Sequence, residues 1–219
     1  MPLHTIGPGP FMLLCAAAVG ALLVAEWRRS QTGKWIAKPI ASTAFVAVAL
    51  ASGALDTTYG LLVLAGLVLC LVGDVLLIPV GRVGVFRAGV FAFLLGHFGF
   101  AAAFLRQPLS LPWFAVGAVA LSLALWRVWQ WLSPTVQADM RVPVVAYLVV
   151  IGAMSALAVA LVGAGGPVIV AAGALAFTAS DVSVARDRFV REQFVNRAWG
   201  LPLYYLAQLM IASSPALVR

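Results

Sequence analysis

Long apolar segments dominate this sequence and restrict what it can fold into. Residues of hydrophobic type make up 63% of the 219 positions, and charged residues only 10%. A lipid hydrocarbon core about 30 Å thick is crossed by an α-helix of about 20 apolar residues, which matches the length of these segments. They show no alternation of period two, so closed barrels are disfavoured. The sequence therefore predicts an all-α, polytopic transmembrane bundle.

Eight such segments are expected to span the membrane, and short connections rich in Gly and Pro join them. No connection is long enough to separate domains. We therefore expect residues 1–219 to form a single transmembrane helical domain. The predicted spans are 10–27, 36–55, 59–79, 87–106, 111–131, 142–163, 167–185 and 199–215.

The net charge of +7 sits mainly in the connections between apolar segments, which indicates membrane orientation and argues against nucleic-acid binding. No Lys or Arg precedes the first apolar segment, whereas Arg28 and Arg29 follow it. A cleaved signal peptide has the reverse order. We therefore interpret this segment as a first spanning helix whose N-terminus lies outside. Cys15 and Cys70, both in apolar segments, are interpreted as small buried hydrophobic residues.

With this orientation, twelve cationic residues fall on the inner side and two, Arg106 and Arg219, on the outer side. Positive residues accumulate on the cytoplasmic side of membrane proteins, so both termini are expected outside. The excess of Arg over Lys favours a bacterial source, and we expect a multi-pass protein of the bacterial cytoplasmic membrane. The inner cations are Arg28, Arg29, Lys34, Lys38, Arg82, Arg87, Arg127, Arg141, Arg186, Arg188, Arg191 and Arg197.

Two similar stretches indicate an internal duplication. "LVGDVLLIP" in the third span and "AFTASDVSVAR" in the seventh each contain one aspartate, Asp74 and Asp181, which are 107 positions apart. The second and sixth spans open on "AKPIA" and "RVPVV", each with a cation followed by a proline. These matches favour the hypothesis of two parallel four-helix repeats, related by an axis along the membrane normal.

The same two aspartates are the predicted catalytic pair. Both are expected near the inner ends of their spans, and an ionisable side chain at membrane depth marks a functional site by default. The alternative is structural: each carboxyl could hold helices together or pair with Lys38. Two carboxyls in a poorly solvated pocket titrate apart, so one can serve as acid and the other as base. We therefore expect acid–base chemistry toward the cytoplasmic half of the bundle.

Five further polar residues are expected in the inner half: Lys38, His97, Tyr204, Tyr205 and Gln208. Their alternative roles are headgroup snorkelling for Lys38, an interhelical hydrogen bond for His97 and an interfacial position for Tyr205. One histidine and two aspartates without a paired-histidine motif do not predict a metal site. The sequence has no GxSxG motif, phosphate-binding loop or dinucleotide fingerprint, so no cofactor is expected and a serine esterase is disfavoured.

These residues occur in motifs that resemble the lysoplasmalogenase family of eight-helix membrane proteins. The resemblance runs from residue 38 to 214 through "AKP", "GDVLL", "FRAGVFAFLLGHFGFAAAF", "SDVSVARDRF" and "YYLAQLMIAS". One departure is Phe100, where relatives often carry a tyrosine three residues after the histidine. The resemblance implies a catalytic pair, Asp74 and Asp181, and substrate-binding residues Lys38, His97, Tyr205 and Gln208.

The resemblance also implies an activity: hydrolysis of the sn-1 vinyl ether bond of a lysoplasmalogen to a fatty aldehyde and glycerophosphoethanolamine or glycerophosphocholine. The implied partners are a lysophospholipid substrate and the lipid bilayer. Two other hypotheses stay open. A proton-coupled transporter of a small or lipid-like substrate would also place carboxylates in a bundle of repeats. A structural or lipid-binding protein would use the aspartates to join helices. The sequence leaves the oligomeric state and the headgroup preference open.

Overall fold

The computed structural model describes residues 7–218, and in this range it contains eight long helices and no strand. Arg219, which the sequence analysis assigned to the outer side, lies outside the described residues. The predicted all-α bundle of eight helices is confirmed. The helices are α1 (Gly9–Trp27), α2 (Gln31–Ala51), α3 (Thr58–Leu76), α4 (Val83–Phe104), α5 (Leu111–Leu132), α6 (Ala138–Gly163), α7 (Val168–Ala185) and α8 (Phe194–Ser213), with short π- and 3₁₀-helical turns, η2 (Arg186–Val190) and η3 (Ser214–Ala216).

Four helices begin four or five residues before the predicted spans: α2 at Gln31, α4 at Val83, α6 at Ala138 and α8 at Phe194. The first turns of α2, α6 and α8 include polar residues, so hydropathy alone does not include them. Local hydrogen bonds fix the start of α2, because Ser30 Oγ accepts a hydrogen bond of 3.1 Å from the amide of Gly33. Hydropathy thus locates the hydrocarbon core, whereas capping locates the end of the helix.

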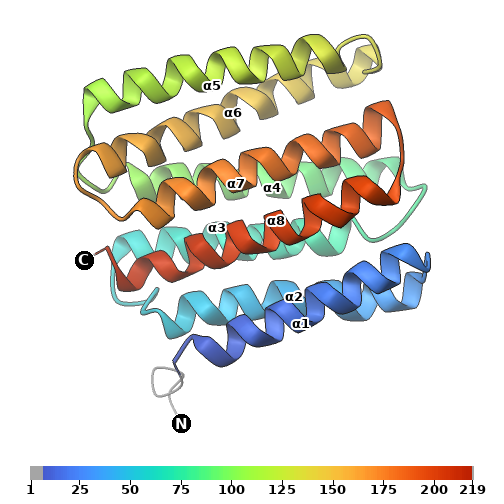
Figure 1. The fold of residues 1–219 in the computed structure, drawn as a ribbon, viewed down its shortest axis with the longest axis horizontal. Helices are drawn as coiled ribbons and strands as arrows, with labels where there is room; N and C mark the ends of the chain where they lie inside the picture. The colour runs from blue at the N-terminus through green and yellow to red at the C-terminus, as the bar shows by residue number, and fades with distance from the viewer. Residues whose placement is uncertain (1–6, 219) are drawn as a thin grey trace.

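Seven of the eight helices are long and apolar enough to cross a membrane by length and composition. The exception is α8, whose sequence includes Asn196, Arg197 and Gln208. In Figure 1 α8 nevertheless lies in the middle of the bundle, beside α7 and in front of α3. Asn196 and Gln208 are buried on one face of α8, whereas Trp199 and Leu206 are exposed on another, so α8 can carry polar residues on its inward face.

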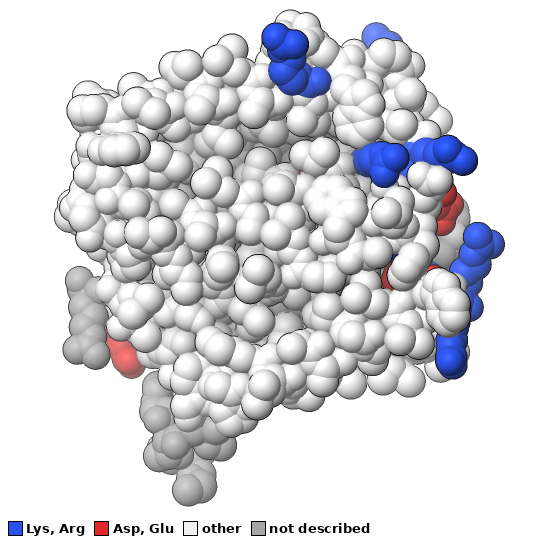
Figure 2. All heavy atoms as spheres, viewed as in Figure 1, with Lys and Arg blue, Asp and Glu red and all other residues white. Residues whose placement is uncertain are grey.

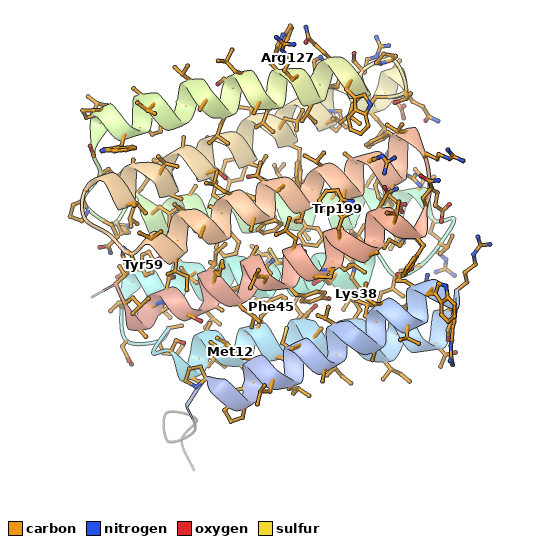
Figure 3. The ribbon with its side chains drawn as sticks, viewed as in Figure 1. Met12, Lys38, Phe45, Tyr59, Arg127 and Trp199 are labelled. Carbon is orange, nitrogen blue, oxygen red and sulfur yellow. The ribbon has the colours of Figure 1, made fainter. Side chains whose placement is uncertain are left out.

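Successive helices run in opposite directions, so α1 begins and α8 ends at the same end of the bundle, on the left in Figure 1. Figure 2 shows most of the visible Lys and Arg side chains gathered at the opposite, right-hand end. We call this the cationic end. Arg127 is an exception; it is an exposed residue on α5, labelled in Figure 3. The observed distribution follows the pattern from which the orientation was predicted.

The packing of the first four helices is repeated by the last four. The α3–α4 pair corresponds to α7–α8, α2–α3 to α6–α7, and the contact of α4 with α6 to that of α8 with α2. Equivalent glycines allow close approach in each half: a Cβ on Gly66 would meet the Phe100 ring at 2.6 Å, and one on Gly173 would meet Ile211 at 2.9 Å. These glycines are 107 positions apart, as the aspartates are. The repeat hypothesis therefore describes the fold.

The repeat is broken at its outer helices. In the first half, α1 packs on both α2 and α8. Its counterpart α5 packs on α6, but among the described residues it makes no comparable contact with α4. Only three residues of α5 are buried, namely Gly117, Leu125 and Leu132. The molecule is therefore more loosely closed between α4 and α5 than at the corresponding place between α8 and α1.

The centre of the bundle is filled by aromatic and aliphatic side chains, including the fully buried Phe45 and Phe177. Cys15 and Cys70 are also buried and form no disulfide. Their prediction as small buried residues is confirmed.

Candidate active site

A cavity of about 630 Å³ lies in the half of the bundle nearer the cationic end. Its lining includes Asp74 from α3 and Asp181 from α7, the two residues predicted as a pair. Lys38 from α2, Tyr147 from α6 and Tyr204 from α8 also line it. In Figure 3, Lys38 lies between α2 and α8, to the right of Phe45, whereas Tyr59 marks the opposite end. Helices from both halves thus contribute to one cavity.

Asp74 is surrounded by hydrogen-bond donors. Its Oδ2 accepts one bond of 2.6 Å from Ser42 Oγ and another of 2.8 Å from the Tyr204 hydroxyl. Its Oδ1 lies 3.2 Å from Lys38 Nζ, and only 3% of the Asp74 side chain is exposed. A carboxylate accepts bonds at both oxygens and is stabilised by a neighbouring cation. These three partners therefore suit an ionised Asp74.

Asp181 has a different set of partners. The Tyr147 hydroxyl donates a hydrogen bond of 2.9 Å to Asp181 Oδ2, and His97 Nε2 lies 3.8 Å from the same oxygen. Within residues 7–218, no Lys or Arg nitrogen lies within 4.0 Å of this carboxyl. The Asp181 side chain is 20% exposed, so it is more accessible than Asp74.

The orientation of the His97 ring follows from its other nitrogen. Nδ1 lies 2.7 Å from the backbone oxygen of Phe93. A carbonyl oxygen only accepts, so Nδ1 must carry the hydrogen. In the neutral ring Nε2 then has a lone pair and no hydrogen. His97 is fully buried, and Nε2 has no hydrogen-bond partner among the described residues.

The two aspartates occupy equivalent positions, and so do the residues that face them. His97 on α4 and Tyr204 on α8 are 107 positions apart, the spacing of Asp74 and Asp181. Each aspartate contacts the fourth helix of the other half, since Asp74 meets Tyr204 and Asp181 meets His97. Each also accepts a hydroxyl bond from the second helix of its own half. The site is therefore built twice, but the two environments differ in the residue from the other half and in the Lys38 cation, which only Asp74 has.

Aromatic rings connect the two aspartate environments. The His97 ring centroid lies 4.5 Å from that of Phe177, and Phe177 lies 5.3 Å from Tyr204. Phe93 contacts Tyr204 as well, at 5.9 Å between ring centroids. Such tilted and edge-on contacts restrict ring motion and fix the polar atoms at the ring edges. The rings therefore hold the facing residues of both aspartates in one packed cluster.

Only some of the predicted site residues line the cavity. Lys38 lines the cavity and pairs with Asp74, whereas His97, Tyr205 and Gln208 are not among the lining residues. Tyr205 is 2% exposed and its hydroxyl lies 3.3 Å from Ser42 Oγ, behind Asp74. Gln208 is fully buried, and its amide atoms have no hydrogen-bond partner in the described part of the chain. Phe100 packs on Gly66 and does not line the cavity either.

Two residues that contact the aspartates were missed from the sequence: Ser42 and Tyr147. Each follows the proline of its helix, Ser42 three residues after Pro39 and Tyr147 four residues after Pro143. Residues three and four apart share one helix face, so the duplicated prolines could have located both hydroxyls.

Charged residues surround the mouth of the cavity at the cationic end. Arg197 bridges three acidic side chains: Glu26 at 2.9 Å, Asp187 at 2.9 Å and Glu192 at 2.8 Å. Arg82 and Arg191 also line the cavity, and no acidic partner is within ion-pair distance in residues 7–218. The mouth can therefore bind an anionic group. No three His, Cys, Asp or Glu side chains of the described range are grouped to hold a metal ion.

Comparisons with known proteins agree with this architecture. A family model described as the YhhN family matches residues 33–215. The chain is 32% identical over 158 residues to lysoplasmalogenase TMEM86A of Bos taurus and 31% identical over 158 residues to that of Homo sapiens. Each match covers 69% of this chain but only 64% of the relative's length. No solved structure matches. Since the family model covers most of the bundle, and the named relatives are those that the motifs resemble, this chain belongs to the YhhN family of lysoplasmalogenase-like membrane proteins.

Proposed function

We propose that this protein is an integral-membrane ether hydrolase that cleaves the sn-1 vinyl ether bond of lysoplasmalogens. The observation that carries the proposal is that Asp74 and Asp181, from equivalent helices of the two halves, line one cavity of a membrane bundle. The relatives named lysoplasmalogenase support this reaction class. The products would be a fatty aldehyde and a glycerophosphoethanolamine or glycerophosphocholine.

The chemistry of a vinyl ether needs one proton donor and one carboxylate. Protonation of the β-carbon of the alkene produces an oxocarbenium ion at the α-carbon. A nearby carboxylate stabilises this cation and directs water to it. The resulting hemiacetal collapses to the aldehyde and the free alcohol. The proposed roles therefore fall to the two aspartates, and no cofactor enters any step.

The shape of the cavity fits a lipid with a single chain. Its volume is within the range of small-molecule sites, roughly 300–1,000 Å³. Apolar residues such as Val90 on α4, Leu125 on α5 and Val144 on α6 line one part, and Arg82 and Arg191 line the mouth. We propose that the chain lies along the apolar part and the phosphate at the mouth. The loosely closed space between α4 and α5 offers a lateral path from the leaflet.

The proposal includes an orientation and a location. The cationic end would face the cytoplasm of a bacterial cell, so that the cavity opens toward the cytoplasmic half of the membrane. Water and the released glycerophospho-alcohol would then exchange through the mouth. Residues 1–219 would form one domain, because helices of both halves contribute to the same cavity.

A proton-coupled transporter is the second candidate, and the repeated halves favour it. The two functions differ in what they need from the far end of the bundle. A transporter needs access from both sides, whereas the lining residues of this cavity come from the half nearer the cationic end. The hydrolase therefore fits the cavity better.

The test uses purified protein in detergent with two substrates of equal chain length. One is a lysoplasmalogen, and the other is a lysolipid with a saturated ester at sn-1. Release of aldehyde from the vinyl ether, without fatty acid from the ester, is the expected result. Folded, monodisperse protein that releases no aldehyde would contradict the proposal. Protein-dependent flux of the lipid or of protons across liposomes, without hydrolysis, would favour the transporter.

A further inference from the structure

We infer that the two aspartates have different protonation states in the resting site: Asp181 holds the proton that starts the reaction, and Asp74 is a carboxylate. This inference rests on the proposed function for its chemistry. The charge assignment itself rests on the geometry and can be measured without turnover. The sequence does not distinguish the two residues, since they occur in similar motifs and at equivalent positions. The difference lies in what faces them.

The surroundings of Asp74 supply hydrogens and positive charge. Ser42 and Tyr204 both donate to Oδ2, and the Lys38 ammonium lies 3.2 Å from Oδ1. A protonated Asp74 would leave the Lys38 charge without a counter-ion in a site where the lysine side chain is only 13% exposed. A buried ammonium beside a neutral acid is energetically unfavourable. This geometry therefore favours the ionised form of Asp74.

The surroundings of Asp181 supply a hydrogen-bond acceptor instead. His97 Nε2 lies 3.8 Å from Oδ2. The ring is fully buried, which favours its neutral form, and in that form Nε2 carries no hydrogen because Nδ1 donates to the carbonyl of Phe93. An ionised Asp181 would set a negative oxygen against this lone pair, with Tyr147 as the only donor in the described residues. A protonated Asp181 can instead direct its hydrogen toward Nε2. Because full burial disfavours an imidazolium at His97, the one proton of this pair is placed on the Asp181 carboxyl.

The repeat makes this contrast an internal comparison. Positions 97 and 204 are equivalent in the two halves, and each faces the aspartate of the other half. A tyrosine at one position donates a hydrogen to Asp74. A histidine with a free lone pair at the other position can only receive one from Asp181. This difference, together with the Lys38 cation that only Asp74 has, separates an acid from a base in a duplicated site.

The exposed fractions agree with this division of roles. The Asp181 side chain is 20% exposed and that of Asp74 is 3% exposed, although both line the cavity. A proton donor must reach the β-carbon of the substrate, and the more accessible carboxyl is better placed for that. A carboxylate that stabilises a cation through the field of its charge can act from a more enclosed position.

The steps balance with these two residues and one water molecule. The Asp181 proton forms a C–H bond at the β-carbon, while the ether oxygen shares its lone pair with the α-carbon to form the oxocarbenium ion. Water adds its oxygen to the α-carbon and gives one proton to Asp74. The hemiacetal then breaks at the ether oxygen: Asp74 returns its proton to the departing alcohol, and Asp181 takes the hydroxyl proton. Aldehyde and alcohol leave, and both side chains are restored.

The test is the infrared carbonyl stretch of a protonated carboxyl group, measured on purified protein at neutral pH in water and heavy water. We expect the wild type to show this band, Asp181→Asn to lack it, and Asp74→Asn to keep it. A band that is absent from the wild type, or that survives in Asp181→Asn, would overturn the inference. The readout needs no substrate. A normal band without aldehyde release would therefore count against the proposed function and not against the charge assignment.

Two more conservative substitutions provide a second test if an asparagine variant fails to fold. Tyr147→Phe removes the hydrogen bond to Asp181, and Ser42→Ala removes one to Asp74. Both changes delete one hydroxyl at equivalent places of the two halves. We expect Tyr147→Phe to shift the frequency of the band and Ser42→Ala to leave it in place. A shift in Ser42→Ala alone would assign the proton to Asp74 and refute the inference.

Discussion

Removing the charge of Lys38 is the perturbation with the clearest expected cost. The Lys38→Met variant keeps the length of the side chain but leaves the Asp74 carboxylate without its cation, 3.2 Å away in the native protein. Taking one partner from a buried ion pair destabilises a protein by about 3–5 kcal/mol. Ser42 and Tyr204 still donate to the carboxylate, so we expect the lower value, about 3 kcal/mol. For a chain of this size that is a decrease of roughly 6–12 °C in Tm.

Thermal unfolding of the detergent-purified protein measures this effect, and a double variant tests its cause. If the cost comes from an uncompensated charge, Asp74→Asn added to Lys38→Met should recover most of the lost Tm. Lys34→Met is the matched control: Lys34 lies 3.6 Å from Glu26, which keeps a second cation, Arg197, at 2.9 Å. We expect this control to cost less than about 1 kcal/mol. Equal losses in the two single variants, or additive losses in the double variant, would refute the reasoning.

Three further predictions concern the site, the substrate path and the orientation. Tyr204→Phe removes a hydrogen bond of 2.8 Å to Asp74 and should reduce kcat for aldehyde release by about tenfold or more. The control is Tyr59→Phe, which removes a hydrogen bond of 2.8 Å to Ser214 at the other end of the bundle and should not change kcat. Val90→Trp places bulk on the α4 side of the cavity and should raise KM more for a long-chain lysoplasmalogen than for a short-chain one. An equal change for both would argue against the proposed path of the chain. Asp56 is an exposed residue of the connection between α2 and α3, at the end opposite the cationic end. With the native cysteines buried, Arg191→Cys should react with a membrane-impermeant thiol reagent only from the cytoplasmic side and Asp56→Cys only from the outside; the reverse pattern would invert the proposed orientation.

Much of the fold followed from the sequence because hydropathy reports the hydrocarbon core directly. The eight helices were predicted, and the cationic end was predicted from the side on which Lys and Arg accumulate. Helix starts were missed where the first turn includes polar residues, as at Gln31 and Phe194, since backbone hydrogen bonding there is independent of apolar character.

The candidate site was predictable only in part. Asp74 and Asp181 stand out because a charge in an apolar segment has few neutral explanations. Ser42 and Tyr147 do not stand out, because hydroxyls are common in membrane helices and their importance depends on which carboxyl they meet. The contact of Asp181 with His97 joins helices of different halves, so it depends on packing that no local pattern encodes.

The central claim is that two intramembrane carboxyls act together on one vinyl ether, and aldehyde release by matched variants tests it most directly. The measurement compares the wild type with Asp74→Asn, Asp181→Asn and Asp139→Asn, the last at an exposed carboxyl outside the cavity, after each is shown to be monodisperse. General acid–base catalysis contributes about 10²–10⁴-fold, so we expect losses of this size in the first two variants and none in the third. Substantial aldehyde release by folded Asp74→Asn or Asp181→Asn would contradict the account.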